Sequence, residues 1–351
     1  MTGWHQTAII AKLGGVEARM KSFNYARPRS LAEASSVLSE LSGKGKAIAG
    51  GTGLVPSLNH SLYRPQTLVD LGNVEALRGI SETALGDVWI GATTRLYEVS
   101  ASELLRSKHP VLADAAGKVA SYQIRSMATI GGNICLDSRC WYYNQSTFWR
   151  KSYPDCRKVG GNTCYVVKAG SRCYALMSSD LAPLLVAMGA KLEVYNTGSS
   201  RLVAVEDLFT GDGARPNNLG PGDVLAHVIL PKLENTVVSF NKYSLHPPVN
   251  FGLVTLAVAI TTDPASKIIQ GARLVYGCVD SAPVRCLEAE SAISGTEVGQ
   301  LDPAKVGAIA GKEITVYSSV NAGQAYKRQI IEWQAAEALW SLIRTLQAAV
   351  E

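Results

Sequence analysis

The sequence has no apolar run long enough to cross a membrane. Its longest apolar stretches, Leu181–Ala190 and Leu253–Ile260, end well short of the roughly 20 residues that a spanning helix needs. The first residues also lack the charged start, long apolar centre and small-residue cleavage site of a secretory signal. We therefore expect a cytoplasmic protein with reduced thiols and no membrane partner. Residues 1–19 are expected to be a loose extension, with Met20 a candidate for the true start.

A large excess of charge of one sign is also missing. Charged residues make up 18% of the 351 residues and the formal net charge is only +5, whereas a nucleic-acid-binding protein usually presents a concentrated basic face. We therefore expect no nucleic-acid partner. The length allows two domains, each with an ordinary hydrophobic core.

Catalytic motifs are absent as well. The five histidines show no metal-ligand spacing, and no nucleophile–base pair or pair of carboxylates stands out. The G-x-G-x-x-G fingerprint of a Rossmann fold is missing too. We therefore expect no catalytic side chain in this chain.

Cysteines are few but clustered. Five of the seven lie within 39 residues, namely Cys135, Cys140, Cys156, Cys164 and Cys173. In a reducing compartment, such clustering indicates metal or redox chemistry more often than disulfides. The last four have the spacing C-x15-C-x7-C-x8-C, which lacks the close pairs of structural zinc sites but suits an iron–sulfur cluster. Buried free thiols are the alternative.

The cysteine segment is also rich in aromatic and cationic residues. Its aromatic side chains could exclude water from a cluster, although packing within the loop explains any single one equally well; they are Trp141, Tyr142, Tyr143, Phe148, Trp149 and Tyr153. Its cations would offset the negative charge of a four-thiolate cluster; they are Arg139, Arg150, Lys151, Arg157, Lys158, Lys168 and Arg172. A solvated face, or a landing site at Arg150 and Lys151 for an acidic electron carrier, are the alternatives for these cations.

Two glycine-rich segments, Ala49–Pro56 and Thr129–Asn133, are candidates for binding phosphate. Glycine allows close approach of the backbone to a ligand, and consecutive N–H groups in such a turn suit phosphate oxygens. One segment alone would be an ordinary turn. Two of them could hold the two ends of a dinucleotide.

Hydrophobic periodicity indicates an α+β class without regular βαβ alternation. A capping box at Ser30 and Glu33 predicts a helix that ends near Gly43. Further helices are predicted for 97–107, 111–121, 180–188 and 326–346, and strands for 47–49, 67–71, 88–91, 191–195, 237–243, 253–261 and 272–279. Proline-bounded segments predict a domain boundary near residue 233, and the cysteine segment, about residues 136–177, is predicted to be a long functional loop.

The motifs AGGTGLVP at 49–56, TIGGN at 129–133 and SDLAP at 179–183 resemble the FAD-binding subunits of the xanthine dehydrogenase and carbon monoxide dehydrogenase family. The resemblance covers about residues 22–345. It implies FAD as cofactor and a two-lobed α+β FAD-binding domain of the vanillyl-alcohol oxidase type over residues 20–233. A smaller C-terminal α+β domain of the CO dehydrogenase flavoprotein type would follow over residues 234–351.

This resemblance also implies which residues contact FAD. The two glycine segments would hold the pyrophosphate, Asp180 would face the ribityl chain or the ring, and three other positions match through weaker motifs. The implied residues are Ala47, Ile48, Ala49, Gly50, Gly51, Thr52, Gly53, Leu54, Val119, Thr129, Ile130, Gly131, Gly132, Asn133, Asp180, Leu225 and Lys242. Gly53 departs from the Asp or other polar residue common in the family, which is expected to loosen one hydrogen bond but to leave the backbone cradle intact.

The cysteine loop resembles that of the 4-hydroxybenzoyl-CoA reductase branch of the family, whose flavin subunit carries an inserted [4Fe-4S] loop. The resemblance implies Cys140, Cys156, Cys164 and Cys173 as the cluster ligands, whereas Cys135 matches none of them.

It further implies two partner subunits, a molybdopterin-binding large subunit and a small subunit with two [2Fe-2S] clusters, assembled as a dimer of heterotrimers. Electrons would enter from ferredoxin and pass through the [4Fe-4S] cluster, FAD and the [2Fe-2S] clusters to molybdenum, where 4-hydroxybenzoyl-CoA is dehydroxylated. An oxidising hydroxylase of the same family and a stand-alone flavin or metal redox sensor are the alternatives.

Overall fold

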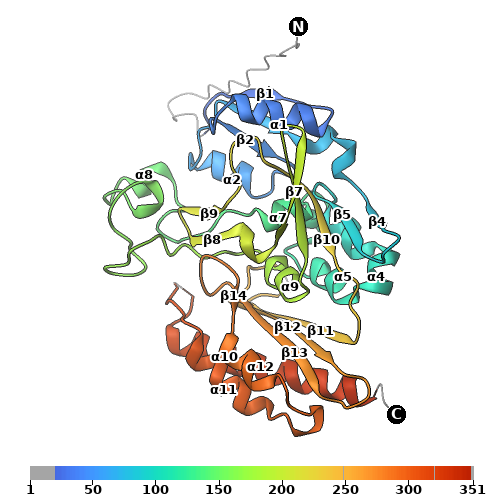
Figure 1. Ribbon diagram of the computed structural model, residues 1–351. Coiled ribbons are helices and arrows are strands. Elements are labelled where there is room, and N and C mark those ends of the chain that lie inside the picture. The colour runs from blue at the N-terminus through green and yellow to red at the C-terminus, as the bar shows by residue number, and fades with distance from the viewer. Residues whose placement is uncertain (1–19, 248, 320, 349–351) are drawn as a thin grey trace.

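The computed structural model describes residues 20–247, 249–319 and 321–348; the extension predicted for residues 1–19 lies outside them. The first lobe is a three-stranded parallel sheet of β1 (Asn24–Ala26), β3 (Thr67–Asp70) and β2 (Gly45–Ile48), in that order. Helix α1 (Leu31–Glu40) connects β1 to β2, and α2 (Leu54–Asn59) follows β2 (Figure 1). Ser30 caps α1 as predicted, by accepting a hydrogen bond from the Glu33 N–H.

The second lobe contains a five-stranded antiparallel sheet in the order β4-β5-β10-β6-β7. Its strands are β4 (Ile80–Glu82), β5 (Val88–Gly91), β10 (Val224–Leu230), β6 (Lys191–Asn196) and β7 (Ser199–Ala204). A hairpin of β8 (Phe209–Asp212) and β9 (Arg215–Asn217) lies apart from this sheet. The helices of the lobe are α3 (Leu96–Ala101), α4 (Glu103–Lys108), α5 (Pro110–Gly117), α6 (Tyr122–Arg125), α7 (Ile130–Ile134), α8 (Thr147–Arg150) and α9 (Leu181–Ala187).

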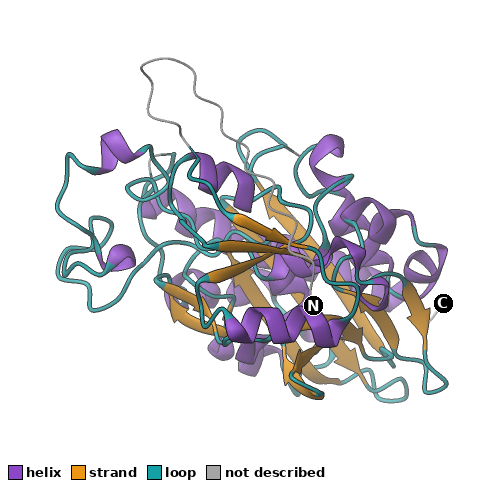
Figure 2. Cartoon of the chain, turned by 90° about the horizontal axis from the view of Figure 1, so that it is seen from above, coloured by secondary structure: helices purple, strands orange, loops and turns teal. Residues whose placement is uncertain are grey.

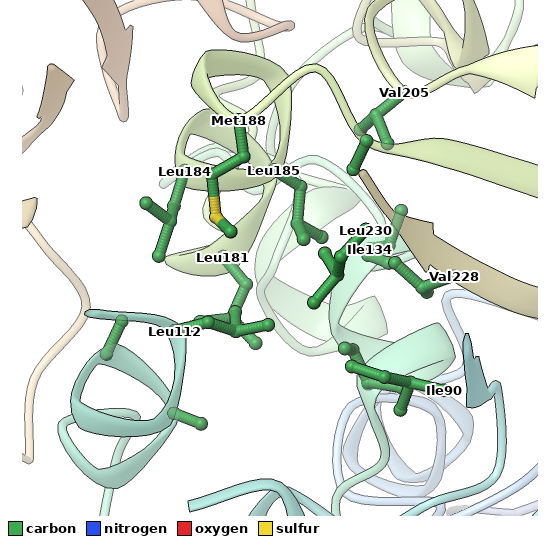
Figure 3. Close-up of a cluster of buried hydrophobic side chains, with 14 of the residues drawn as sticks. Ile90, Leu112, Ile134, Leu181, Leu184, Leu185, Met188, Val205, Val228 and Leu230 are labelled. Atoms are coloured by element: carbon green, nitrogen blue, oxygen red, sulfur yellow. The ribbon is translucent and has the colours of Figure 1, made fainter. Parts of the chain in front are cut away.

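Helix α9 is the centre of the larger core. All seven of its residues are buried, and Figure 3 shows its Leu181, Leu184 and Leu185 directed toward side chains from α5, α7 and the five-stranded sheet. Full burial of a side chain of this size contributes about 1.5–3 kcal/mol. The short helix is therefore held by its surroundings rather than by its own propensity.

The C-terminal part is a four-stranded antiparallel sheet covered by three helices. The strands are β11 (Thr236–Tyr243), β12 (Val254–Thr262), β13 (Ile269–Gly277) and β14 (Val284–Arg285), in chain order. The helices are α10 (Leu287–Ile293), α11 (Pro303–Glu313) and α12 (Gln324–Ala348). The segment that joins β10 to β11, residues 231–235, contains the predicted boundary at residue 233.

Both faces of the C-terminal sheet are covered, because successive strand residues point to opposite faces. Ala257 and Ala259 of β12 belong to the core around α9, whereas Leu256 and Val258 belong to a second core with α10, α11 and α12. Gly277 permits the close approach of α9, since a Cβ there would lie 2.4 Å from Pro183 Cγ. The sheet therefore joins the core around α9 to the C-terminal helices.

Most predicted elements are present, and Figure 2 shows the mixture of helices, strands and long loops that the chain forms. The helix predicted for 97–107 is two helices, because Ser102 leaves helical geometry and caps α4. The segment 129–133 is not a turn but the start of α7, with Thr129 as its N-cap. In the described part of the chain, no helix has the length and apolar character needed to span a bilayer.

Candidate flavin and cysteine sites

A cavity of about 450 Å³ lies between the two lobes and the start of the C-terminal sheet. Fourteen of the seventeen predicted FAD residues line it, from the end of β2 and the segment that joins it to α2, from the N-terminal ends of α7 and α9, from the residues after α5 and from β11. They are Ala47, Ile48, Ala49, Gly50, Gly51, Thr52, Gly53, Leu54, Val119, Thr129, Gly132, Asn133, Asp180 and Lys242. The two glycine segments, which are far apart in the sequence, therefore face one space. We call it the flavin cavity.

The other three predicted residues lie behind its wall. Ile130 is fully buried and Leu225 nearly so, both in the core around α9. Gly131 packs against the residue that follows β5, since a Cβ there would lie 2.7 Å from the Ala92 Cβ. The structure thus places these residues as supports of the cavity and not on its surface. In α7, helical geometry turns Ile130 and Gly131 toward the core together with Ile134, whereas Leu225 is an inward residue of strand β10.

Two glycines in the first segment are required by the backbone. Gly51 has φ +71°, in the left-handed region that favours glycine. A Cβ on Gly50 would lie 1.9 Å from the Met127 carbonyl oxygen, which no side-chain adjustment could relieve. Gly53 is less constrained, because a Cβ there would meet only the Leu136 side chain, at 3.0 Å.

Asn133 positions the start of α9 against α7. Its Oδ1 accepts hydrogen bonds from Ser179 Oγ (2.7 Å) and from the Leu181 N–H (3.3 Å). Ser179 Oγ in turn accepts from the Ala182 N–H at 3.0 Å. This network places Asp180, at the N-terminal end of α9, on the flavin cavity.

Asp180 and Lys242 form a buried ion pair in the cavity wall. Lys242 Nζ lies 2.7 Å from Asp180 Oδ2, and the two side chains are only 5% and 4% exposed. Burial raises the pKa of Asp180, and the Lys242 ammonium and the nearby Gly252 N–H only partly oppose this. The other oxygen, Oδ1, meets no donor at hydrogen-bonding geometry in the described structure. A buried acceptor of this kind suits a hydrogen-bond donor on a ligand.

The sequence did not reveal a second, polar wall of the flavin cavity, which includes Lys46, Tyr63, Asp137, Arg139 and Phe251. The Tyr63 hydroxyl donates to Asp137 Oδ2, and Lys46 Nζ lies 4.0 Å from the Tyr63 ring centroid. Burial lowers the pKa of Lys46, with Asp137 opposing the shift. These residues come from four separate segments and carry no shared motif that could have identified them.

The four predicted cluster ligands also face one space. Cys140, Cys156, Cys164 and Cys173 line a cavity of about 20 Å³, here called the cysteine cavity. Burial is the main cause that raises the pKa of Cys140, and Cys156 and Cys164 add to the shift, so these thiols are close enough to interact. All cysteines are free thiols. Cys135 instead lines the flavin cavity, where burial raises its pKa to about 12.

The donor set suits a polynuclear group better than a single ion. Within the described residues, no three His, Cys, Asp or Glu side chains are placed to hold one metal ion. Four thiols around one space are nevertheless what an iron–sulfur cluster needs, since its core spans several ångströms. The cysteine cavity therefore fits the predicted cluster in the chemistry of its ligands.

Aromatic side chains cover one side of the cysteine cavity. Tyr142, Tyr153 and Tyr165 form ring contacts with centroids 5.4–6.1 Å apart, and Tyr143 is buried in the cavity wall. Trp141 and Phe148, by contrast, are 56% and 88% exposed. Of the aromatic residues expected to exclude water, Tyr142 and Tyr143 therefore line the cavity, whereas these two residues face solvent.

The cations of the loop have separate roles. Arg172 forms an ion pair with Asp280, in which Nη2 lies 2.8 Å from Oδ1 and 2.7 Å from Oδ2. The Arg150 guanidinium donates to the carbonyls of His60 and Ser61, both at 3.1 Å, and so holds α8 against the end of α2. Lys151 is exposed. Of the two residues suggested as a landing site, only Lys151 thus offers its charge to solvent.

The two ends of the cysteine loop are tied together. Arg139 and Leu176 exchange both backbone hydrogen bonds, each 2.8 Å long. We call this backbone pair the neck of the loop. Beyond it, the segment around α8 projects from the side of the molecule, as the green ribbon in Figure 1 shows. Residues 140–175 thus form one loop whose two ends meet at Arg139 and Leu176.

The sequence matches two known domain families in the same order as the two parts of the fold. Residues 21–233 match the FAD binding domain in molybdopterin dehydrogenase, and residues 244–339 match the CO dehydrogenase flavoprotein C-terminal domain. The chain belongs to the molybdopterin dehydrogenase FAD-binding family. It is thus an FAD-binding medium subunit of the molybdenum hydroxylase group and part of an oxidoreductase.

Curated relatives support this family assignment. The chain is 29% identical over 266 residues to the aldehyde oxidoreductase FAD-binding subunit of Escherichia coli, covering 72% of this chain and 81% of that protein. It is 24% identical over 310 residues to the glyceraldehyde dehydrogenase medium chain of Sulfolobus acidocaldarius, covering 88% and 94%.

Solved structures confirm the predicted fold class. Quinoline 2-oxidoreductase from Pseudomonas putida 86 aligns with a TM-score of 0.73 at 20% identity, over 95% of this chain and 99% of that chain. Reconstituted CO dehydrogenase from Oligotropha carboxidovorans aligns with a TM-score of 0.74 at 24% identity, over 91% and 97%.

Proposed function

We propose that this chain is an electron-transfer subunit that holds FAD in the flavin cavity and a [4Fe-4S] cluster in the cysteine cavity. The proposed cluster rests on one observation: four cysteines line one space, namely Cys140, Cys156, Cys164 and Cys173. Family membership supports the proposed FAD site. The two sites adjoin, since Lys158 lines the cysteine cavity and bonds to Asp137, which lines the flavin cavity.

For FAD, the proposed role of the glycine segments is to offer backbone N–H groups to the pyrophosphate. Gly50 and Gly51 would allow the close approach, and Asp180 Oδ1 would accept a hydrogen bond from the flavin side. The Asp180–Lys242 pair would hold that acceptor in place. When bound, the flavin supplies both one- and two-electron chemistry, which suits a relay between carriers of different capacity.

The finer proposal concerns the whole complex. The proposed partners are a molybdopterin-binding large subunit and a small [2Fe-2S] subunit, together forming a dimer of heterotrimers. Within it, this chain would pass electrons from ferredoxin toward molybdenum for the reductive dehydroxylation of 4-hydroxybenzoyl-CoA. The resemblance of the cysteine loop to that of the 4-hydroxybenzoyl-CoA reductase branch supports this proposal, although the same carriers serve electron flow in either direction.

The second candidate is the flavin subunit of an oxidising hydroxylase. The relatives include an aldehyde oxidoreductase and a glyceraldehyde dehydrogenase, and this favours the oxidising direction over the reductive one. To decide, the purified complex would be supplied with reduced ferredoxin and 4-hydroxybenzoyl-CoA, or with aldehydes or purines and an electron acceptor. Turnover only in the second assay would reject the reductive proposal.

The cluster is tested by measuring iron, acid-labile sulfide and FAD in anaerobically purified protein. We expect about four irons and about one FAD per chain, with iron lost and FAD kept in Cys156→Ser. Cys135→Ser is the matched control, because this thiol lies in the same region but lines the other cavity, and it should keep its iron. Flavin without iron in the unmodified protein would reject the cluster and leave an ordinary hydroxylase flavin subunit.

A further inference from the structure

The buried ammonium of Lys158 has no role in the function proposed so far. Lys158 lies in a 3-10 turn, η3 (Arg157–Val159), two residues after Cys156. Its side chain is 4% exposed. Nζ donates to Asp137 Oδ1 (2.9 Å), Ser138 Oγ (2.7 Å) and the Gly213 carbonyl (2.6 Å), so all three of its protons have acceptors.

The Lys158–Asp137 pair spans the wall between the two cavities in a defined direction. Lys158 lines the cysteine cavity, together with Tyr143, and its Nζ is 5.1 Å from the Tyr143 ring centroid. Asp137 lines the flavin cavity instead. The cation of the pair therefore comes from a residue of the cysteine cavity, and the anion from a residue of the flavin cavity.

This charge is held in place from several directions. The second oxygen of Asp137 accepts from the Tyr63 hydroxyl, and Ser138 Oγ donates to the same Gly213 carbonyl at 2.7 Å. A charge fixed away from solvent acts with little screening. Of the other cations in the loop, Lys151 and Lys168 are exposed to solvent.

We propose that Lys158 is a positioning residue that raises the reduction potential of the cluster in the cysteine cavity. The proposal rests on the function proposed above, because it concerns that cluster. Reduction adds one electron, delivered by an electron-carrier protein, and no bond is made or broken. A nearby fixed cation stabilises the more negative reduced cluster. Asp137 opposes this effect from the far side of the pair.

The test is a redox titration of the purified complex, with the reduced cluster followed by electron paramagnetic resonance. At the potential where half of the wild-type cluster is reduced, Lys158→Met should show less than half reduced and Asp137→Asn more than half. Lys158→Arg keeps the charge, so of the two Lys158 variants its reduction potential should be the closer to that of the wild type. Lys168→Met removes an exposed cation of the same loop and should leave the potential unchanged.

Iron and sulfide are measured first in every variant. Absence of iron from the wild type would reject the proposed function, and this inference with it. A retained cluster with an unshifted potential in Lys158→Met would reject the inference alone. If Lys158→Met loses its cluster, Asp137→Asn decides: a higher potential supports the inference, and an equal or lower one overturns it. A purely structural pair would not shift the potential in opposite directions.

Discussion

The buried pair of Asp180 and Lys242 predicts a large and pH-dependent loss of stability when one partner is removed. Both side chains are nearly inaccessible, so Lys242→Met leaves a carboxylate without its cation inside the protein. Such a change costs about 3–5 kcal/mol in the free energy of unfolding. Asp180→Asn/Lys242→Met removes both charges and should recover much of this cost, giving a coupling energy of about 2 kcal/mol.

The sign of the pH dependence follows from the raised pKa of Asp180. Loss of Lys242 removes an interaction that lowers this pKa, so in Lys242→Met it rises further above its value in the unfolded chain. The stability that goes with a raised pKa is present at low pH and is lost as the pH rises through the folded pKa. The destabilisation by Lys242→Met should therefore shrink as the pH falls from about 8 to about 5.

The assay is urea unfolding followed by circular dichroism, at one fixed excess of FAD because bound ligand adds to apparent stability. Wild type, Asp180→Asn, Lys242→Met and the double variant complete the cycle. Costs of the single variants that add within about 0.5 kcal/mol would show that the two residues do not interact. A cost of Lys242→Met that does not change with pH would refute the assignment of the buried charge to Asp180.

Two further predictions concern the walls of the sites. Gly50→Ala should lower the FAD content and should lower the free energy of unfolding by about 1–3 kcal/mol, because the added Cβ meets the Met127 carbonyl. Gly299→Ala, which has open space around it, is the control in thermal unfolding. Equal stability of the two variants would contradict the reasoning. Lys151→Glu should slow reduction by an acidic carrier at low salt but not at high salt, whereas Lys305→Glu in α11 should not; a rate that Lys151→Glu leaves unchanged would exclude docking there.

Local sequence signals predicted the parts of the site that one segment builds by itself. The glycine-rich segments 49–56 and 129–133 were found because each carries its signal in consecutive residues, and the structure brings these two segments to one cavity. Lys46, Tyr63 and Asp137 were missed because their proximity depends on where long connections place them. No motif spacing records that kind of contact.

One strand that is buried in the middle of its sheet was not predicted. Strand β10, at the centre of the five-stranded sheet, was not predicted, because Val224–Leu230 is an almost continuous apolar run without the alternation of a half-exposed strand. The final helix was predicted correctly at 326–346, but not every large apolar residue on it faces the core. Tyr326 and Trp333 are 41% and 50% exposed, whereas Ile331 and Ala335 are fully buried.

The neck at Arg139 and Leu176 places the two ends of the cysteine loop side by side. Because these ends bond to each other, the strands and helices on either side do not depend on residues 140–175 to span a distance between them. The entropy of closing a loop grows only slowly with its length, and a long insertion at such a point costs the fold little. If the loop holds the proposed cluster, a single insertion at the neck is enough to add a second redox centre to a flavin subunit. A graft of this loop onto another flavin subunit would need a matching neck and also partners for Arg150 and Arg172.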